Sequence, residues 1–323
     1  MKSDQEANPK KATVNRRGMF RILGAGAAAT VAAVPAAKAS VAPDQVRVAP
    51  QNAAAMLYDT TLCIGCKACV SACNETNNLP ADPGFSKHIN NIYNAPPSLN
   101  SSTKNIIKLY KNADNTEWSF VKQQCMHCVD PSCVQACPLS SLTKGAHGIV
   151  AWNGNQCIGC RCCQLACPFN IPKFEWTAVN PKIVKCEMCK HRLDVGLQPA
   201  CTEACPRGAV VYGTREQLLA EARKRVAANP GKYFDNRVYG EKEGGGTQVL
   251  YLSHVPFTKI GLPELDSEAN AAKVRTNTEH IYQGGITPLV IYGALLGVTR
   301  HFFKEHVKEA EEEKAKTGLK EQL

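Results

Sequence analysis

Seventeen cysteines occur among 323 residues, and sixteen of them fall into four blocks of four. The first and third blocks are Cys63-x2-Cys66-x2-Cys69-x3-Cys73 and Cys157-x2-Cys160-x2-Cys163-x3-Cys167. The second and fourth are Cys125-x2-Cys128-x4-Cys133-x3-Cys137 and Cys186-x2-Cys189-x11-Cys201-x3-Cys205. The odd total excludes complete disulfide pairing within the chain, which is also too long for a small disulfide-stapled scaffold. Something other than S–S bonds must therefore organise these thiols.

The spacing within the blocks is typical of the cysteine runs that bind [4Fe–4S] clusters in bacterial ferredoxins. Three thiolates joined by short loops can wrap one face of a cubane, while the fourth lies on the following helix and points toward a neighbouring cluster. Pro138, Pro168 and Pro206 end three of the blocks, and Asn74 follows the first. Sixteen ligands at four per cluster predict four [4Fe–4S] clusters.

Zinc is the competing interpretation, because paired C-x2-C elements also form zinc ribbons. The fourth block, with eleven residues between Cys189 and Cys201, would suit zinc if it stood alone. The first and third blocks would not, because each has a third cysteine two residues beyond the pair. A structural zinc-binding adaptor therefore stays the alternative from another class, and iron–sulfur binding is favoured.

Two further residues of the blocks are not assigned as ligands. Cys162 could replace Cys163 only by breaking the spacing of the third block, so we interpret it as a small packed thiol. His127 lies in a loop whose neighbours already supply thiolates, and we expect it beside a cluster or on the surface. No catalytic nucleophile or base is recognisable, which favours an electron conductor over an enzyme.

The sequence predicts an α+β fold of two ferredoxin-like units in tandem. Short helices are expected between the third and fourth cysteines of each block, and an amphipathic helix over 215–228. The polar segment from Asn74 to Asn105 is expected to be a surface loop. Strand-like runs flank the blocks at 56–58, 118–121, 148–152 and 209–212. Because so little conventional core is expected, cluster ligation should supply much of the folding energy.

The N-terminal segment is predicted to be a twin-arginine export signal over residues 1–39. Arg16 and Arg17 precede an uncharged, Ala/Gly-rich run, and Ala37-Lys38-Ala39 forms a cleavage site of the A-x-A type. Because this route exports folded proteins, clusters could be built in the reducing cytoplasm first. The predicted location is the periplasmic side of the inner membrane.

The C-terminal region contains an apolar stretch over 284–303, which is interpreted as a single transmembrane helix whose basic end snorkels. Arg300, Lys304 and Lys308 would then lie on the cytoplasmic side, as the positive-inside rule requires. The whole predicted organisation is a signal over 1–39, a linker over 40–55, a four-cluster domain over 56–240, an extension toward partner subunits over 241–283, the helix over 284–303 and a cytoplasmic tail over 304–323.

Composition and net charge limit what kind of chain this is and which partners it could bind. The chain is 44% hydrophobic and 20% charged, which excludes a disordered chain. The formal net charge of +10 falls to about +5 without the predicted signal, which carries seven of the 38 basic and two of the 28 acidic residues. That excess, with no stripe of basic and aromatic residues, argues against nucleic acid as a partner.

The four blocks in this order resemble the four-cluster electron-transfer subunits of membrane-bound oxidoreductases. These include the β subunits of formate dehydrogenases and the iron–sulfur subunits of dimethyl sulfoxide reductase, nitrate reductase and hydrogenase-2. The resemblance spans about residues 56–260, and 238–250, reading VYGEKEGGGTQVL, together with Val255-Pro256, favours the hydrogenase-2 type over formate dehydrogenase.

The resemblance, and not the spacing, implies which fourth cysteine crosses to which cluster. We refer to the implied ligand groups as sets I to IV. Set I is Cys63, Cys66, Cys69 and Cys205, and set II is Cys73, Cys186, Cys189 and Cys201. Set III is Cys125, Cys128, Cys133 and Cys167, and set IV is Cys137, Cys157, Cys160 and Cys163.

The resemblance also implies a function. The chain would carry electrons between a periplasmic [NiFe] hydrogenase, with large and small subunits, and a quinone-reactive integral membrane subunit. A molybdenum subunit, as in formate dehydrogenase, is the alternative catalytic partner, since the cysteines do not distinguish the two. In either case catalysis would reside in the partner.

Overall fold

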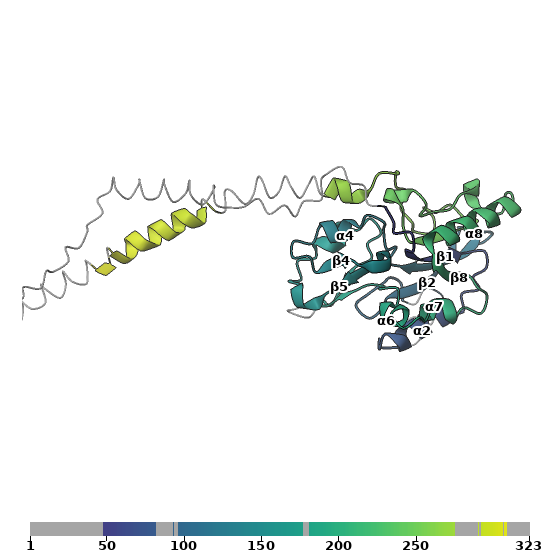
Figure 1. Ribbon diagram of the computed structural model, residues 1–323, viewed down its shortest axis with the longest axis horizontal. Helices are drawn as coiled ribbons and strands as arrows, with labels where there is room; N and C mark the ends of the chain where they lie inside the picture. The colour runs from purple at the N-terminus through teal and green to yellow at the C-terminus, as the bar shows by residue number, and fades with distance from the viewer. Residues whose placement is uncertain are drawn as a thin grey trace, which may run out of the picture. The chain divides into compact units, whose positions relative to one another are not determined.

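The computed structural model describes residues 48–81, 93, 96–176, 181–274, 290, 292–305 and 307–308. The chain divides into two units, residues 1–45 and 46–323. The first unit lies outside the described residues, as do the predicted export signal and the first half of the predicted linker over 40–55. The account below therefore concerns the body formed by residues 48–274, which contains all seventeen cysteines (Figure 1).

A three-stranded sheet in the order β8-β1-β9 lies at the centre of the body. Strand β1 (Ala54–Asp59) is buried along its whole length. It pairs antiparallel with β8 (Val210–Thr214) and parallel with β9 (Val249–Leu252). Because β1 precedes the first cysteine block and β8 follows the fourth, this pairing joins the two ends of the cysteine-rich region.

Three further sheets are antiparallel and have two strands each. They pair β2 (Asn105–Lys111) with β3 (Trp118–Gln124), β4 (Leu142–Lys144) with β5 (Val150–Trp152), and β6 (Lys173–Phe174) with β7 (Ile183–Val184). Isolated two-stranded ribbons are marginally stable in water. Their stability must come from packing. Ile107, Phe120 and Val121 lie in one hydrophobic cluster with Tyr58, and Leu142, Val150, Phe174 and Ile183 lie in another.

Short helices lie within the cysteine blocks. Four of them begin at or just before the third cysteine and run toward the fourth, as predicted, whereas a fifth, between Cys189 and Cys201, was not expected. They are α2 (Ala68–Thr76), α4 (Ser132–Gln135), α5 (Cys162–Leu165), α6 (Lys190–Leu193) and α7 (Ala200–Glu203). Single 3-10 turns lie at η2 (Ala146–Gly148), η3 (Gly154–Gln156), η4 (Phe234–Asn236) and η5 (Glu243–Gly245). The mixed helix and strand content confirms the α+β class.

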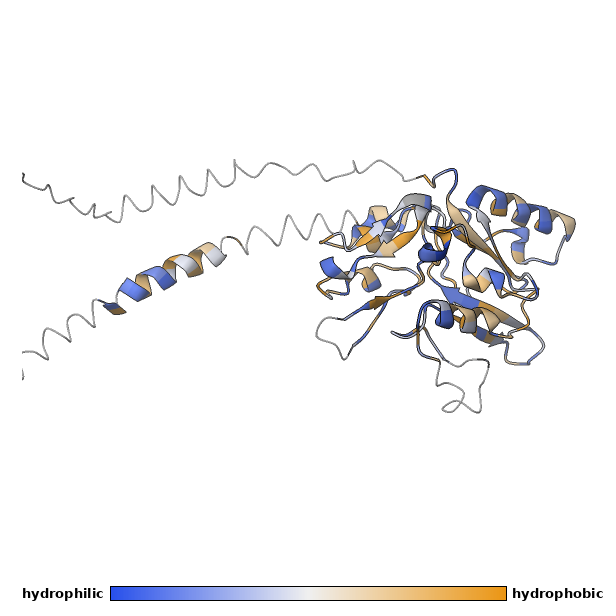
Figure 2. Ribbon diagram, turned by 60° about the horizontal axis from the view of Figure 1, so that its bottom comes forward, coloured by the Kyte–Doolittle hydropathy of each residue, from blue (hydrophilic) through white to orange (hydrophobic). Residues whose placement is uncertain are grey.

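Helix α8 (Arg215–Ala228) has the bounds that its periodicity predicts. Thr214 caps its N-terminus through a capping box with Gln217, which satisfies two backbone N–H groups that a helix start leaves free. Its buried residues Leu218, Leu219, Ala222 and Val226 pack with alternate residues of β1 and β9. Figure 2 shows hydrophilic and hydrophobic residues side by side on this helix.

Two parts of the body differ from the sequence-based expectations. The segment expected to be a loop over 74–105 begins within α2 and ends at β2, a strand that the sequence analysis did not identify. The boundary expected at residue 240 does not separate two packing units. Strand β9 pairs with β1, and Val255, Phe257 and Ile260 are buried in the same cluster as Tyr58. The expected extension therefore belongs to the body as far as residue 274, and 275–283 lie outside the described residues.

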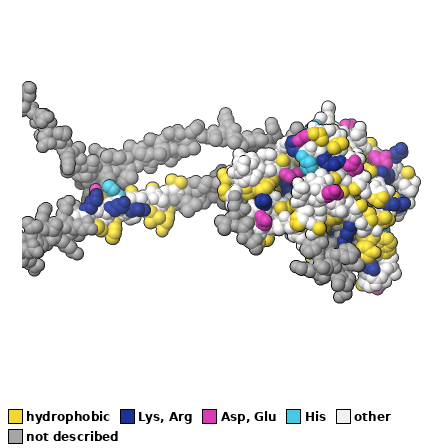
Figure 3. Space-filling model, turned by 90° about the horizontal axis from the view of Figure 1, so that it is seen from below, with side chains coloured by type: hydrophobic (Ala, Val, Ile, Leu, Met, Phe, Trp, Pro, Cys, Tyr) yellow, Lys and Arg dark blue, Asp and Glu magenta, His cyan; other side chains and the backbone are white. Residues whose placement is uncertain are grey.

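Residues 292–305 are helical and carry both apolar and charged side chains (Figures 2 and 3). Within the described part of the chain, no helix has both the length and the apolar character needed to cross a membrane. The predicted span over 284–303 lies partly outside the described residues, since 284–289 and 291 are not among them.

Candidate iron–sulfur centres

All seventeen cysteines are described, and all are free thiols. Their exposure varies with position in the chain. Cys66 and Cys160 are exposed, and seven are buried, namely Cys69, Cys73, Cys125, Cys163, Cys186, Cys189 and Cys201. The structure thus contains no disulfide, and its thiols are available as metal ligands once deprotonated.

The C-x-x-C loops of the four blocks share one backbone feature. The residue before the second cysteine has a positive φ in every block: 70° at Gly65, 47° at His127, 70° at Gly159 and 54° at Met188. This left-handed turn lets the loop curl toward its own first cysteine. The backbone N–H of Gly65 donates to Cys63 Sγ at 3.4 Å. The internal repeat seen in the sequence is therefore also a repeat of backbone conformation.

The same N–H···S geometry occurs in the fourth block, where Met188 donates to Cys186 Sγ at 3.3 Å. A left-handed conformation costs a residue with a side chain ~1–2 kcal/mol, a cost that glycine avoids. The fourth block accepts this cost at a fully buried methionine. The same left-handed turn therefore forms without glycine. This indicates that the orientation of the backbone N–H toward the sulfur, and not the flexibility of the turn, is the constrained feature.

The thiols of set I lie near one another. Burial raises the pKa of the Cys63 thiol, and the neighbouring thiols of Cys205 and Cys66 raise it further. Burial likewise raises the pKa of Cys69 to about 12, with contributions from Cys63 and Cys205. These mutual effects bring a thiol of the fourth block, Cys205, among three of the first.

Set II also combines the first and fourth blocks. Burial raises the pKa of Cys73 to about 11, and the thiols of Cys201 and Cys189 add to it. Burial raises the pKa of Cys186 as well, and Cys73 and Cys201 are the next thiols that raise it. Cys73 is thus grouped with thiols of the fourth block that lie more than a hundred residues further along the chain.

Sets III and IV combine the second and third blocks in the same way. In set III, burial raises the pKa of Cys128, and the thiols of Cys167, Cys125 and Cys133 raise it further. In set IV, burial raises the pKa of Cys163 to about 12, and three thiols of this set contribute, namely Cys137, Cys160 and Cys157. Thiols of the first and fourth blocks therefore interact with one another, as do thiols of the second and third, while which four of them hold one iron–sulfur cluster stays a prediction.

The four sets also form a row. Thiols of sets I and II interact through Cys69 and Cys201. Sets II and III interact through Cys186 and Cys125, and sets III and IV through Cys133 and Cys163. Each set is thus adjacent to the next in the order I, II, III, IV. The two exposed cysteines belong to the end sets, Cys66 to set I and Cys160 to set IV.

A buried lysine lies beside sets I and II. Lys122 of β3 is 1% exposed, and its ammonium donates to the side-chain oxygen of Gln124. Burial alone would lower its pKa, yet the pKa is raised, by Cys201 and Cys69 foremost. An isolated buried ammonium costs several kcal/mol, so it needs anions nearby. Thiolates bound to iron would supply that negative charge, whereas neutral thiols would not.

A second buried lysine, Lys185, lies near the two middle sets, II and III. Lys185 is 3% exposed, and its ammonium donates to the carbonyl oxygens of Val150 and Cys186. It lowers the pKa of Cys133 in set III, against the larger opposing effect of burial. The sequence analysis missed both lysines. No motif includes them, and Lys122 lies in a strand that also carries the polar residues Ser119, Gln123 and Gln124.

His127 is fully buried, so the surface position left open by the sequence does not occur. Its Nδ1 accepts a hydrogen bond from the backbone N–H of Val150 at 3.1 Å. Nδ1 is therefore the unprotonated ring nitrogen and Nε2 carries the proton. Burial lowers the pKa of His127 well below its usual range, which keeps the ring neutral. Nε2 has no partner among the described residues.

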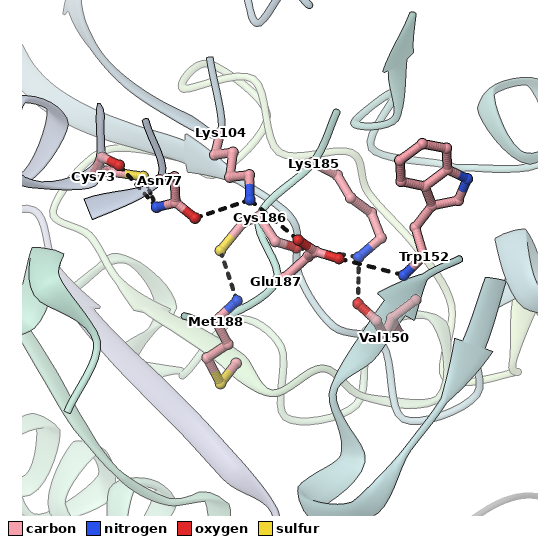
Figure 4. A network of polar contacts seen from close by, with 9 residues as sticks. All are labelled: Cys73, Asn77, Lys104, Val150, Trp152, Lys185, Cys186, Glu187 and Met188. Carbon is pink, nitrogen blue, oxygen red and sulfur yellow. Dashed lines mark hydrogen bonds and ion pairs between the residues drawn. The ribbon is translucent and has the colours of Figure 1, made fainter. Parts of the chain in front are cut away.

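A polar network connects the ligand segments of set II (Figure 4). The side-chain N–H of Asn77 donates to Cys73 Sγ at 3.6 Å and to the Cys73 carbonyl oxygen at 2.8 Å. Lys104 donates to Asn77 Oδ1 at 2.9 Å and pairs with Glu187 Oε2 at 3.1 Å. Glu187 follows Cys186 directly. The network therefore links the first and fourth blocks where they share a set.

The donor sets suit iron–sulfur clusters. Each set offers four thiols and no carboxylate or imidazole, and soft thiolates are the ligands that such clusters take, one per iron. In the part of the chain that the structure describes, no three or more His, Cys, Asp or Glu side chains are placed to hold a single metal ion. The buried lysines suit an anionic group, as fully thiolate-ligated clusters are.

Fold and thiol sets together define a ferredoxin-type protein with repeated cluster-binding units. Comparison with known families agrees: two family models, each described as a 4Fe-4S dicluster domain, match residues 62–141 and 116–215. The tandem dicluster organisation predicted from the sequence is thereby confirmed.

Similar proteins extend the match beyond the cysteine blocks. The chain is 37% identical to the hydrogenase-2 operon protein HybA of Escherichia coli O157:H7 over 321 residues, covering 89% of this chain and 95% of that protein. It is 35% identical to the iron-sulfur subunit of the nitrate-inducible formate dehydrogenase of Escherichia coli K12, covering 78% and 83%. The chain belongs to this family of iron–sulfur electron-transfer subunits of oxidoreductases.

Proposed function

We propose that the chain holds four [4Fe–4S] clusters, one in each of sets I to IV, and conducts electrons along the row between a catalytic subunit and a membrane partner. The row of four adjacent thiol sets carries this proposal. When bound, each cluster accepts and releases one electron. The residues of the chain hold the clusters at neighbouring positions, exclude water from the middle of the row and offset its negative charge with Lys122 and Lys185.

The ends of the row are the entry and exit points in this proposal. All four thiols of set II are buried, whereas sets I and IV each include an exposed one, Cys66 and Cys160. Two exposed apolar side chains, Ile64 and Ile158, lie in the same loops as these cysteines, and they would suit protein surfaces docking there. Because all irons would have thiolate ligands, no open coordination position is left for substrate. Catalysis would therefore occur in a partner subunit.

The catalytic partner is proposed to be a [NiFe] hydrogenase with large and small subunits. The similarity to a hydrogenase-2 operon protein over 95% of its length supports this choice. A molybdenum-containing formate dehydrogenase is the second candidate, supported by 35% identity over 78% of the chain to a formate dehydrogenase iron-sulfur subunit.

Export by the twin-arginine signal over 1–39 and anchoring by the segment over 284–303 complete the proposal. They would place the body at the periplasmic side of the inner membrane, next to a quinone-reactive integral membrane subunit. The paired arginines, the cleavage site and the uncharged stretch from Gly284 to Val298 support this arrangement.

Anaerobic purification of the full chain tests the proposal. We expect about 16 iron and about 16 sulfide per chain, from four cubanes, with reversible reduction and no hydrogen or formate oxidation. Stoichiometric zinc without sulfide, or intrinsic turnover, would refute it. Affinity capture from membranes then decides the partner, since nickel in the captured complex indicates hydrogenase and molybdenum indicates formate dehydrogenase.

A further inference from the structure

In the Asn77–Lys104–Glu187 network, the donors of Lys104 determine how the side-chain amide of Asn77 is oriented. A lysine ammonium has three donors and no acceptor. Lys104 therefore requires the oxygen of the Asn77 amide, which it contacts at 2.9 Å. The same contact turns the Asn77 N–H2 group toward Cys73, whose sulfur lies 3.6 Å from Nδ2. The Cys73 carbonyl oxygen, which accepts from the same Nδ2 at 2.8 Å, favours the same orientation of the amide.

Lys104 is itself held in place. Its side chain is 18% exposed, and Glu187 accepts its second contact at 3.1 Å. The other carboxylate oxygen of Glu187 accepts from the backbone N–H of Trp152 at 3.4 Å. The carboxylate of Glu187 is thus fixed by its contact with β5, and its backbone is fixed by its position next to Cys186. Figure 4 shows these side chains pointing toward one another from separate segments of the chain.

A second side-chain amide lies beside the first block. Asn105, which directly follows Lys104 at the start of β2, donates from Nδ2 to the Cys69 carbonyl oxygen at 3.3 Å. Among the described residues, the side-chain amide that donates to the sulfur of Cys73 is that of Asn77. Such donors stabilise negative charge on sulfur, and they stabilise it more after a cluster has gained an electron.

We propose that Lys104 is a positioning residue that acts through Asn77: it fixes the amide so that N–H donates to Cys73, and it thereby raises the reduction potential of the cluster held by set II above the value that the thiols alone would give. The inference rests on the proposed function, since it needs a cluster in that set. It adds residues that none of the cysteine motifs includes.

A purely structural role for Asn77 is the competing explanation. Asn77 follows α2, and both its backbone N–H and its side chain donate to the Cys73 carbonyl oxygen, at 3.1 and 2.8 Å. A capping role alone would make Asn77→Leu less stable but leave the reduction potentials unchanged. The potential of one cluster is therefore the readout that separates the two roles.

The experiment is a redox titration of the anaerobically purified full chain, followed by electron paramagnetic resonance. The variants are Asn77→Leu, Lys104→Met, Lys104→Arg and the double variant N77L/K104M. Lys190→Met is the control. Lys190 lies next to Cys189 of the same set, but it pairs with Asp194 in solvent at 2.5 Å and is 55% exposed.

Asn77→Leu and Lys104→Met should each lower the same single potential, by about a tenfold fall in the equilibrium constant for one-electron reduction, or ~59 mV. Lys104→Arg, which keeps a donor for Oδ1, should stay close to the unmodified protein, as should Lys190→Met. The double variant should shift no further than Asn77→Leu alone, because Lys104 acts through the amide. If Asn77→Leu loses the cluster, the comparison of Lys104→Met with Lys104→Arg decides.

An unchanged set of potentials in Asn77→Leu would overturn the inference and leave the proposed function standing, provided that iron and sulfide remain at four clusters. Additive shifts in the double variant would overturn it too, because they would mean that Lys104 acts by charge alone. An equal shift in Lys190→Met has the same consequence. Unmodified protein without four clusters would instead refute the proposed function, and the inference with it.

Discussion

Substitution of Gly65 by alanine tests whether the C-x-x-C loops are as constrained as their geometry indicates. Gly65 has a φ of +70°, and a Cβ at this position would lie 2.4 to 2.7 Å from three ring atoms of Phe120. The ring cannot move away freely. Phe120 is 7% exposed and packs against Trp118 and Tyr93, with ring centroids 5.6 and 5.4 Å away.

The magnitude follows from a matched control. Gly231 has a φ of +78°, and nothing lies within 4 Å of a Cβ built there. Both Gly→Ala changes incur ~1–2 kcal/mol of left-handed strain, and both gain ~0.4–1 kcal/mol from the less flexible unfolded chain. These contributions cancel in the difference between the two variants. What remains is the clash with Phe120, for which overpacking costs of ~1–3 kcal/mol are usual.

The assay is anaerobic thermal unfolding of both variants at one scan rate, followed by cluster absorbance and by circular dichroism. With ~2–4 °C per kcal/mol for a domain of this size, Gly65→Ala should unfold roughly 2–12 °C below Gly231→Ala. We also expect faster loss of colour, because moving the loop lengthens the Gly65 N–H···S contact to Cys63. Equal unfolding temperatures would show that the Phe120 ring yields at no cost and would refute the reasoning.

Three further predictions follow from the site. Cys162→Ser should leave iron content and all reduction potentials unchanged, whereas Cys163→Ser should lose one cluster signal; a loss in both would make Cys162 a ligand. Lys122→Met should lower the potential of one or both neighbouring clusters, by roughly 90 mV if its charge contributes about 2 kcal/mol at ~7 Å and an effective dielectric of ~20; titration by electron paramagnetic resonance measures this. Burial and the Asp59 carboxylate raise the pKa of Tyr233 to about 12 from 10.0, so the folded state holds this proton more tightly, and stability present below pH 10 is lost as pH rises toward 12. Tyr233→Phe should flatten the fall of the unfolding temperature with pH above 10, and an unchanged slope would contradict the assignment.

The cysteine blocks could be read from the sequence because their chemistry is local. In the first and third blocks, three thiolates that can contact one cubane are separated by only two residues each, so spacing alone identifies these blocks. Helix α8 was also predictable, since the residues Leu218, Leu219, Ala222 and Val226 repeat at helical intervals. In both cases neighbouring residues determine the outcome.

Strand β2 and the buried lysines could not be predicted in this way, because their partners are distant in sequence or absent from any motif. Ile106 of β2 is buried in a cluster with Ile171 and Cys186, and Ile107 in the cluster of Tyr58, all of which lie far from β2 in sequence. Lys122 reads as a solvent-facing strand residue until the fold brings Cys69 and Cys201 beside it. The burial of Lys122 could not be predicted from the sequence, because the cysteines that it faces come from the first and fourth blocks.

The pairing of β1 with β8 explains how blocks at opposite ends of the body come to share sets I and II. In this register Tyr58 faces Val210, so the strand entering the first block and the strand leaving the fourth lie side by side. Cys63 and Cys205 are each five residues from this pair. The second and third blocks lie between them in sequence and combine with each other. Closing the central sheet therefore brings the ligands of the outer sets together, and forming those sets in turn stabilises the sheet, so strand pairing and cluster binding should be cooperative.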